Sequence, residues 1–508
     1  MKNSTKLFRS RSILIGLIFL GISAKDPLVA AEQQKQPNII FFFIDDMGWK
    51  DWNGNGNPKV DTPSINRIAD EGVVFNQGYV NAANCAPSRC CVLSGQYTPR
   101  THFYNVWSID RGNENTDRLS LDDVEDGQVF SEEKISFAEA LKKAGYATAM
   151  YGKWHVSGHS KAGSGNEGGV SAQMQGFDDV LEHSAGKLKA LYSTTKDPKH
   201  INTYTDRAIR FAEKNVKENK PFMIYLAHHA VHGPIEYSQE SFEHIANRSG
   251  ADKNPLQGYA SMMYDTDKSI GRVLDKLEEL KIRNNTVIIF LSDNGGVPGV
   301  GGGSQAPLRC FKGSYYEGGI RVPFIISWPE HFKPSKTETP VMAIDLYPTM
   351  LELAGVKDID KHLGDYPIDG KSILSLLNGG SMKERAIFWH FPGYLVGNPK
   401  YTETRVPEYR QLPVSVIRKG DWKLLLHLEE WSLDGGLDTI DTNNAIELYN
   451  LKEDIGEKNN LALTNVEKRN AMLRELLTWH QNVNAEIPKE PNPLLGKGDP
   501  KKKKDPNK

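Results

Sequence analysis

Two long apolar runs, each followed at once by a pair of oxygen-bearing side chains, constrain the fold of this chain most strongly. They are residues 38–44, followed by Asp45 and Asp46, and residues 286–292, followed by Asp293 and Asn294. Runs without polar alternation are typical of strands that are buried on both faces, as in a sheet covered by helices. Since parallel strands end at the same edge of a sheet, we expect the four polar side chains to meet there.

The rest of the chain alternates between helical and extended patterns as far as about residue 380. Helices are expected at 62–72, 136–143, 205–215 and 259–280, and further strands at 147–151, 222–227 and 322–328. This alternation predicts an α/β fold with a large, mostly parallel sheet sandwiched by helices. Later segments predict a smaller C-terminal domain of antiparallel sheet plus helix, with strands at 385–391, 414–418, 422–427 and 446–448 and a helix at 466–481.

The two ends of the chain differ in composition from the rest. Basic residues precede an apolar run at 13–22 and the small residues Val29, Ala30 and Ala31, as in a cleaved signal peptide. We therefore expect a signal peptide at 1–31, a catalytic domain at 36–380, a C-terminal subdomain at 381–488 and a disordered Lys/Pro-rich tail at 489–508. The mature protein is expected to be periplasmic or secreted, with no membrane anchor.

The overall charge and the cysteine content exclude other classes of protein. The 508 residues carry a formal net charge of −2, so no global field points to nucleic acid. The chain has only 4 cysteines, which are Cys85, Cys90, Cys91 and Cys310. An exported protein with so few does not depend on a disulfide framework, and the sequence leaves open whether Cys310 pairs with Cys90 or Cys91.

The stretch Cys85-Ala86-Pro87-Ser88-Arg89 is the most informative local motif. Ser88 is a good helix cap, so we expect a helix whose N-terminus faces Cys85. Free N–H groups and the helix dipole favour an anion there, and Arg89 offers a fork of donors for sulfate or phosphate. The alternative is a helix N-terminus with a small buried thiol.

Asp45, Asp46, Asp293 and Asn294 together form a hard oxygen site. Three carboxylates and one amide suit Ca²⁺ or Mg²⁺ and are poor ligands for Zn²⁺. Taken singly, each pair also fits ordinary turn chemistry at a strand end.

Cationic residues and histidines follow several of the expected strands or lie in loops. They are Lys153 and His155 after the strand at 147–151, His228, His229 and His232 after the strand at 222–227, and Lys312 in the 307–314 loop. Loops at strand ends are where sites are built, although a lone lysine or histidine is more often a surface or packed residue.

These motifs, in this order from about residue 37 to 460, resemble the type I, formylglycine-dependent sulfatases of the alkaline-phosphatase-like superfamily. The resemblance rests on the Cys85 motif with Leu93 and Gly95 behind it, Gly-Lys-Trp-His at 152–155, Ser-Asp-Asn-Gly-Gly at 292–296 and Glu-Gly-Gly-Ile-Arg-Val-Pro at 317–323. It implies that Cys85 is converted to formylglycine (3-oxoalanine) by a formylglycine-generating or anaerobic sulfatase-maturing enzyme. It also implies a metal, usually calcium, held by Asp45, Asp46, Cys85, Asp293 and Asn294, with Arg89, Lys153, His155, His232 and Lys312 around the sulfate.

The resemblance also implies the reaction, which is hydrolysis of a sulfate ester, with a sulfated carbohydrate as the expected substrate. We expect His232 to protonate the leaving oxygen and His155 to act as the base, although His228 and His229 compete because Val231 replaces a proline common in the family. Aromatic loops at 100–107 and 389–394 either hold sugars or pack internally. The alternatives are a phosphomonoester or phosphonate hydrolase on the same fold, or an inactive glycan-binding relative.

Overall fold

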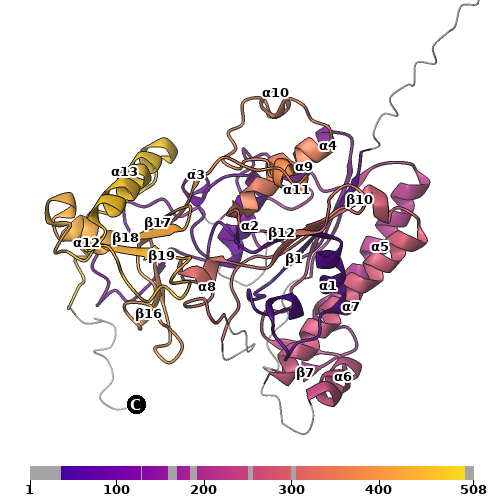
Figure 1. The fold of residues 1–508 in the computed structure, drawn as a ribbon, viewed down its shortest axis with the longest axis horizontal. Coiled ribbons are helices and arrows are strands. Elements are labelled where there is room, and N and C mark those ends of the chain that lie inside the picture. The colour runs from indigo at the N-terminus through magenta and orange to yellow at the C-terminus, as the bar shows by residue number, and fades with distance from the viewer. Residues whose placement is uncertain are drawn as a thin grey trace, which may run out of the picture. The chain divides into compact units, whose positions relative to one another are not determined.

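An eight-stranded sheet forms the centre of the fold in the computed structural model (Figure 1). Its order is β12 (Ser335–Thr337), β2 (Gly72–Phe75), β11 (Phe324–Ser327), β10 (Thr286–Ser292), β1 (Asn38–Ile44), β8 (Phe222–Ala227), β5 (Ala147–Gly152) and β6 (Asp179–Leu181). Strand β1 pairs in parallel with β10 and β8, and within this described sheet only β11 runs against its neighbours. The prediction of a large, mostly parallel sheet is confirmed.

Apolar side chains cover both faces of this sheet. On β1, Phe41 and Phe43 belong to one buried cluster, whereas Ile40 and Phe42 belong to a second cluster on the opposite face. The second cluster is completed by α1 (Pro63–Asp70), α5 (Ile201–Lys217) and α7 (Gln257–Glu279), of which α5 and α7 lie side by side in Figure 1. The first cluster includes α2 (Cys85–Ser94), α4 (Phe137–Lys143) and α9 (Leu346–Leu353). A strand buried on both faces needs an unbroken apolar sequence, which explains the runs that end in Asp45 and Asp293.

Short elements connect these layers. Helix α4 begins with a capping box, in which Glu139 N donates to Ser136 Oγ and Ser136 N donates to Glu139 Oε2. The other helices are α3 (Thr98–Thr101), α6 (Gln239–Ser249), α8 (Glu317–Ile320), α10 (Ile359–Leu363), α11 (Leu374–Leu377) and α12 (Leu428–Leu433), and two small sheets pair β13 (Val341–Met342) with β3 (Gly78–Tyr79) and β7 (Tyr192–Thr194) with β9 (Ile235–Tyr237). No helix among the described residues is long and apolar enough to span a membrane.

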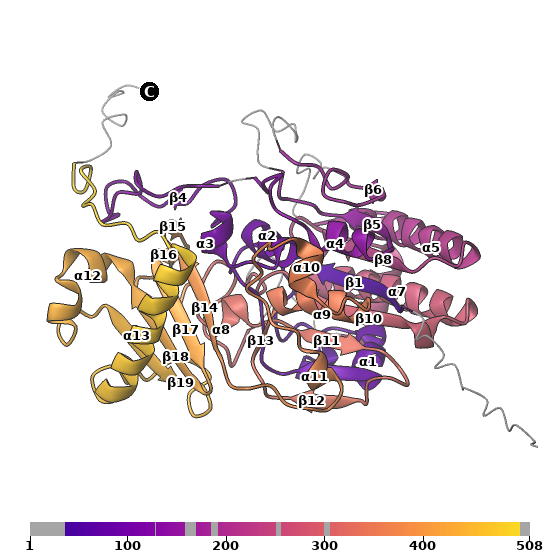
Figure 2. The same cartoon turned by 90° about the horizontal axis from the view of Figure 1, so that it is seen from above.

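A four-stranded antiparallel sheet follows in the C-terminal part, as the sequence predicts (Figure 2). It consists of β14 (Ala386–Phe391), β17 (Val414–Lys419), β18 (Trp422–His427) and β19 (Ile446–Asn450), and α13 (Val466–Val483) packs on it. The rings of Phe388 and Trp479 stack between sheet and helix with centroids 4.7 Å apart. The apolar core runs without interruption from the large sheet into this smaller one.

A third sheet, which the sequence does not predict, is built from three distant segments. Its order is β16 (Tyr409–Gln411), β15 (Tyr394–Val396) and β4 (Asp110–Arg111). In register, Leu395 lies opposite Gln411 on one side and Arg111 on the other. The strands are too short to show a hydrophobic period in the sequence.

A buried ion cluster joins helix α8 to the four-stranded sheet, and we call it the Lys423 cluster. Lys423 Nζ lies 3.0 Å from Glu317 Oε1 and 2.8 Å from Glu457 Oε1, and all three side chains are fully buried. Tyr79 donates a hydrogen bond to Glu317 Oε2, and Glu317 N donates to Glu457 Oε2, both at 2.7 Å. Each carboxylate oxygen in the cluster therefore faces a cationic or hydrogen-bonding group.

The structure describes residues 36–127, 129–157, 169–183, 192–249, 256–298 and 305–497. The predicted signal peptide and residues 498–508 lie outside this range. Residues 489–497, which the sequence analysis assigns to a disordered tail, instead contact the 114–120 segment. Pro491 forms a bridge with Leu119, and Asn492 N donates to Arg118 O at 2.8 Å.

Candidate functional site

The polar side chains that follow β1 and β10 meet at the carboxyl edge of the large sheet. In the register, Ile44 lies opposite Ser292, so Asp45 and Asp293 leave adjacent strands at the same level. One ligand atom each from Asp45, Asp293 and Cys85 lies within 4.8 Å of the others, and all three residues are buried. The structure therefore brings these residues together at one point, as the sequence analysis predicted.

Two buried oxygen atoms at this point have no hydrogen-bond donor in the described chain. They are Asp45 Oδ1 and Asn294 Oδ1. Asn294 Nδ2 donates to Asp46 Oδ1 at 2.8 Å, which leaves the amide oxygen of Asn294 as the free acceptor. Burying acceptors without a donor is costly unless a cation binds them. A donor set of carboxylate and amide oxygens fits Ca²⁺ or Mg²⁺.

Cys85 is the first residue of α2, and Asn84 occupies the N-cap position. The helix thus begins four residues earlier than the prediction of a Ser88 cap requires, and that prediction is wrong. The Cys85 side chain lies at the positive end of a buried helix, where an anion is favoured. Lys312 Nζ lies 3.8 Å from Cys85 Sγ.

Lys153 and Lys312 bring two ammonium groups to the carboxylates. Lys153 Nζ donates to Asp45 Oδ2 at 2.7 Å and Lys312 Nζ to Asp46 Oδ1 at 2.6 Å. Burial alone raises the pKa of Asp45, but Lys153 and other nearby positive charges outweigh it and hold this pKa well below its usual range. Burial lowers the pKa of Lys312, but Asp46, Cys85, Asp45 and Asp293 together outweigh it, so the net shift is upward and the ammonium stays charged.

Arg89 is completely buried and its guanidinium is bound to the protein. Its Nε and Nη2 donate to Asp293 Oδ2 at 3.0 and 2.7 Å, and Nη1 donates to the Lys153 carbonyl oxygen at 3.0 Å. The sequence suggested that this fork holds an anion. In the structure it instead fixes one carboxylate of the centre and the backbone that carries a lysine of the centre.

The three histidines after β8 have different surroundings. His228 is fully buried, its Nε2 lies 3.1 Å from Ser269 Oγ, and burial lowers its pKa to about 4. Burial and the charge of Lys153 lower the pKa of His229 to about 3. His232 exposes 43% of its side chain, and its Nε2 lies 3.7 Å from Asp46 Oδ2. Among these three, His232 combines solvent exposure with proximity to the centre.

Two expectations about the neighbourhood can now be judged. All four cysteines are free thiols, so the structure forms no disulfide between Cys310 and Cys90 or Cys91. In the 389–394 loop, Trp389 is fully buried and donates to the Val80 carbonyl oxygen at 2.7 Å, so it packs internally. Of the aromatic residues in the 100–107 loop, Trp107 is 58% exposed.

The sequence analysis did not single out Lys199. Its pKa is lowered by burial and by the charge of Lys153, although Glu236 and Asp45 raise it. It sits in the short turn before α5, with a positive φ of 49°. No motif or strand end marks this position, so nothing in the sequence signals it.

Comparisons with known proteins agree with this geometry. The family model described as Sulfatase matches residues 37–356, and the model described as N-sulphoglucosamine sulphohydrolase, C-terminal, matches residues 311–482. A sulfatase of Formosa agariphila is 31% identical over 92% of this chain and 91% of its own. The N-acetylgalactosamine-6-sulfatase of Mus musculus is 31% identical over 72% of this chain and 70% of its own.

A solved structure with a similar fold was determined in complex with its substrate D-glucosamine-2-N,6-O-disulfate. It has a TM-score of 0.61 and 21% sequence identity, and the match covers 90% of this chain and 100% of that chain. The family-model match spans more than half of the described residues, including the strand-end ligands and the Cys85 helix. The chain therefore belongs to the sulfatase family, as the motifs indicated, and is a sulfuric ester hydrolase.

Proposed function

We propose that the protein is an exported sulfatase that removes sulfate from a sulfated carbohydrate, with Cys85 matured to formylglycine and a divalent metal, Ca²⁺ or Mg²⁺, bound beside it. The observation that carries this proposal is the buried meeting of Cys85 with Asp45 and Asp293, together with the two acceptors that lack donors. The similarity to an N-acetylgalactosamine-6-sulfatase supports a sulfated amino sugar as the substrate class.

The metal would be held by Asp45, Asp46, Asp293, Asn294 and the side chain at position 85. When bound, the metal supplies positive charge for the sulfate oxygens, and the formylglycine hydrate supplies the nucleophile. Lys153 and Lys312 add two buried positive charges at the same place. They reduce the repulsion between an anionic ester and an attacking oxygen.

Arg89 is a positioning residue in this proposal. It holds Asp293 through two nitrogens and the backbone of Lys153 through the third. Three of the five N–H groups of Arg89 are used in this way, which orients the ligands of the metal.

His232 is the proposed general acid. Its Nδ1 lies 2.5 Å from the Gly233 carbonyl oxygen, which can only accept a hydrogen bond. Nδ1 therefore carries a proton, and Nε2 is the nitrogen that gains and loses the second proton of the ring. Nε2 faces Asp46 at the edge of the centre, where a leaving oxygen would emerge. His155 follows Lys153 by two residues on the same loop and is the proposed base that restores the modified side chain.

The maturation of Cys85 is tested by measuring the mass of the tryptic peptide that contains it, in protein produced with a formylglycine-generating enzyme. We expect the mass loss for oxidation of the Cys85 CH2–SH group to an aldehyde with loss of the sulfur, together with multiple turnover of nitrophenyl sulfate. Cys85→Ala should reduce turnover by more than about 10⁴-fold, because the nucleophile is lost. A variant with unchanged turnover, or a wild type that prefers nitrophenyl phosphate, would refute the proposal.

A further inference from the structure

Two arginines beside the reaction centre have no counter-anion. Several buried or half-buried arginines pair with carboxylates, as Arg283 does with Glu71 and Arg405 with Glu430. Arg309 and Arg418 instead donate hydrogen bonds to neutral oxygens. Arg111 and Arg410 are both half-buried, yet within the parts of the chain that the structure describes no carboxylate lies within ion-pair distance of either. A guanidinium withdrawn from water without an anion is unfavourable, so this pair calls for an explanation.

Arg410 lies directly over the segment that carries Lys312. Its guanidinium is 5.6 Å from the ring centroid of Phe311, on one side of that lysine. On the other side, its stem packs against Gly313, where an added Cβ would lie only 3.1 Å from Arg410 Cδ and 2.7 Å from Leu395 Cδ2. Lys312 contacts both Asp46 and Cys85. Arg410 packs against the two neighbours of Lys312, so this one lysine lies between Arg410 and the reacting group. Its buried Nε has no hydrogen-bond partner.

Arg111 approaches from the Cys85 side. Its guanidinium lies 5.4 Å from the Trp107 ring centroid, and its Nη1 donates to the Val106 carbonyl oxygen at 3.5 Å. Val106 N and Asn84 Nδ2 both donate to Asn105 Oδ1, at 2.8 and 3.1 Å, and Asn84 precedes Cys85. A short chain of contacts therefore connects Arg111 to the first residue of α2.

The three-stranded sheet brings the two arginines together. Arg111 ends β4 and Arg410 is the central residue of β16, and both strands pair with β15 through Leu395. Burial lowers the pKa of Arg410 and the positive charge of Arg111 lowers it further, while the charge of Asp46 offsets part of this shift. Such mutual repulsion is expected of two cations that await a common anion.

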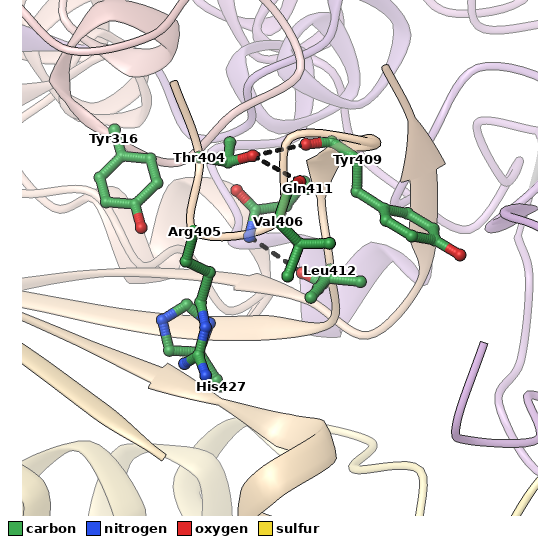
Figure 3. A pocket seen from close by; sticks show the side chains of 8 residues that line it. All are labelled: Tyr316, Thr404, Arg405, Val406, Tyr409, Gln411, Leu412 and His427. Atoms are coloured by element: carbon green, nitrogen blue, oxygen red, sulfur yellow. Dashed lines mark hydrogen bonds between the residues drawn. The ribbon is translucent and has the colours of Figure 1, made fainter. Parts of the chain in front are cut away.

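Hydrogen bonds hold in place the 404–412 segment, which contains β16 and therefore Arg410; Figure 3 shows the residues that form them. Thr404 Oγ1 donates to the carbonyl oxygens of Val406 and Tyr409 at 2.8 and 2.7 Å, and Gln411 Nε2 donates to Leu412 O at 2.9 Å. The cavity beside these residues is only about 10 Å³, too small for more than one water molecule. The segment therefore presents Arg410 in a fixed position and is not itself a sugar site.

We propose that Arg111 and Arg410 form a second anion-binding subsite, which recognises either an additional sulfate on the sugar that carries the scissile sulfate ester or the carboxylate of a sugar linked to it. The exposed Trp107 ring beside Arg111 supplies an apolar platform for the sugar. This inference rests on the proposed function, and it defines the preferred substrate as a sugar with two negative groups.

The test uses three probes that differ in charge. They are an N-acetylhexosamine 6-sulfate, the same sugar linked to a uronic acid, and the same sugar with a second sulfate. We expect the wild type to prefer one of the doubly charged probes, which identifies the source of the anion. Arg410→Met and Arg111→Met should each lower kcat/KM on that probe by about 10- to 100-fold, mainly through KM. The loss of kcat/KM on the singly charged probe should be at least about ten times smaller.

Matched variants separate charge from packing. Arg405→Met removes an arginine from the same segment that already pairs with Glu430, so the preference among the probes should stay unchanged. Arg410→Lys should recover part of the loss, because it keeps the positive charge. Equal losses on all three probes would show that the arginines serve the reacting sulfate, and no loss would show a packing role; either result overturns the inference.

Binding measured by calorimetry keeps this test independent of turnover. In Cys85→Ala protein, the preferred doubly charged probe should bind at least about tenfold more weakly when Arg410→Met is added. Equal affinity with and without Arg410→Met would refute the subsite. Failure of the wild type to hydrolyse nitrophenyl sulfate or any probe would instead refute the proposed function.

Discussion

The reaction centre and the Lys423 cluster are both buried groups of opposite charges, but they differ in how their oxygens are used. In the Lys423 cluster, each oxygen of Glu317 and Glu457 faces an ammonium, a hydroxyl or a backbone N–H. In the reaction centre, Asp45 Oδ1 and Asn294 Oδ1 have no donor among the described residues. A closed ion cluster stabilises a junction, whereas a cluster with free acceptors is built to bind something else.

The strongest way to break this comparison is to remove the metal with a chelator. We expect activity on nitrophenyl sulfate to be abolished, because the three carboxylates of the centre are then left close together. The free energy of unfolding should fall by about 3–4 kcal/mol, the value for a ligand present at 100 to 1,000 times its Kd. Ca²⁺ or Mg²⁺ should restore both, and elemental analysis identifies the ion. Full activity in metal-free protein would contradict the assignment.

The next largest effect concerns stability and comes from the Lys423 cluster. Lys423→Met leaves two carboxylates buried without their cation, which should lower the free energy of unfolding by about 3–5 kcal/mol. Urea denaturation measures this change, and kcat on nitrophenyl sulfate should stay constant for the folded fraction. Lys419→Met is the control, because Lys419 forms an exposed pair with Glu475 whose loss costs about 1 kcal/mol or less. Similar losses in both variants would show that burial does not matter.

A smaller, pH-dependent effect sharpens the comparison. Burial raises the pKa of Glu447, but the charge of His427 and the hydrogen bonds from His427 and Tyr316 outweigh it and lower this pKa to about 2. A carboxyl whose pKa is lowered in the folded state stabilises the protein above the unfolded value of 4.5 and loses that contribution as the pH falls towards 2.

The stabilisation by Glu447 amounts to about 3 kcal/mol when complete. Glu447→Gln should therefore be less stable than the wild type near pH 6, and the difference should shrink as the pH approaches 3. Urea midpoints at several pH values test this, with the pH profile of sulfate hydrolysis expected to stay unchanged. A difference that is constant with pH would mean that the charge of Glu447 contributes nothing.

The large sheet and the members of the site could be predicted because their signal lies along the chain. The runs at 38–44 and 286–292 are strands β1 and β10 with the same bounds, since a strand buried on both faces must be apolar throughout. The Cys85 motif and the strand-end carboxylates could be recognised because they too are marked by residues that are close together in the sequence. Which of these groups bind substrate, metal or water remains a prediction.

Other features depend on tertiary packing, which the sequence does not reveal. Arg89 reads as a free anion-binding fork, but its direction is set by Asp293, which lies 204 residues away in the chain. The sequence leaves open whether Trp389 holds a sugar or packs internally, and it is buried because β14 is covered by the large-sheet core. The pairing of β4, β15 and β16 joins segments of two or three residues and leaves no periodic signal.

The three-stranded sheet has a consequence for how this protein can be engineered. Its strands place Arg111 and Arg410 next to the reaction centre without contributing any of the residues that hold Cys85, Asp45 or Asp293. Substitutions on β4 and β16 can therefore change which sugar is accepted while the sulfate-handling groups stay as they are. A library restricted to these two strands is a compact starting point for engineering desulfation of chosen polysaccharides.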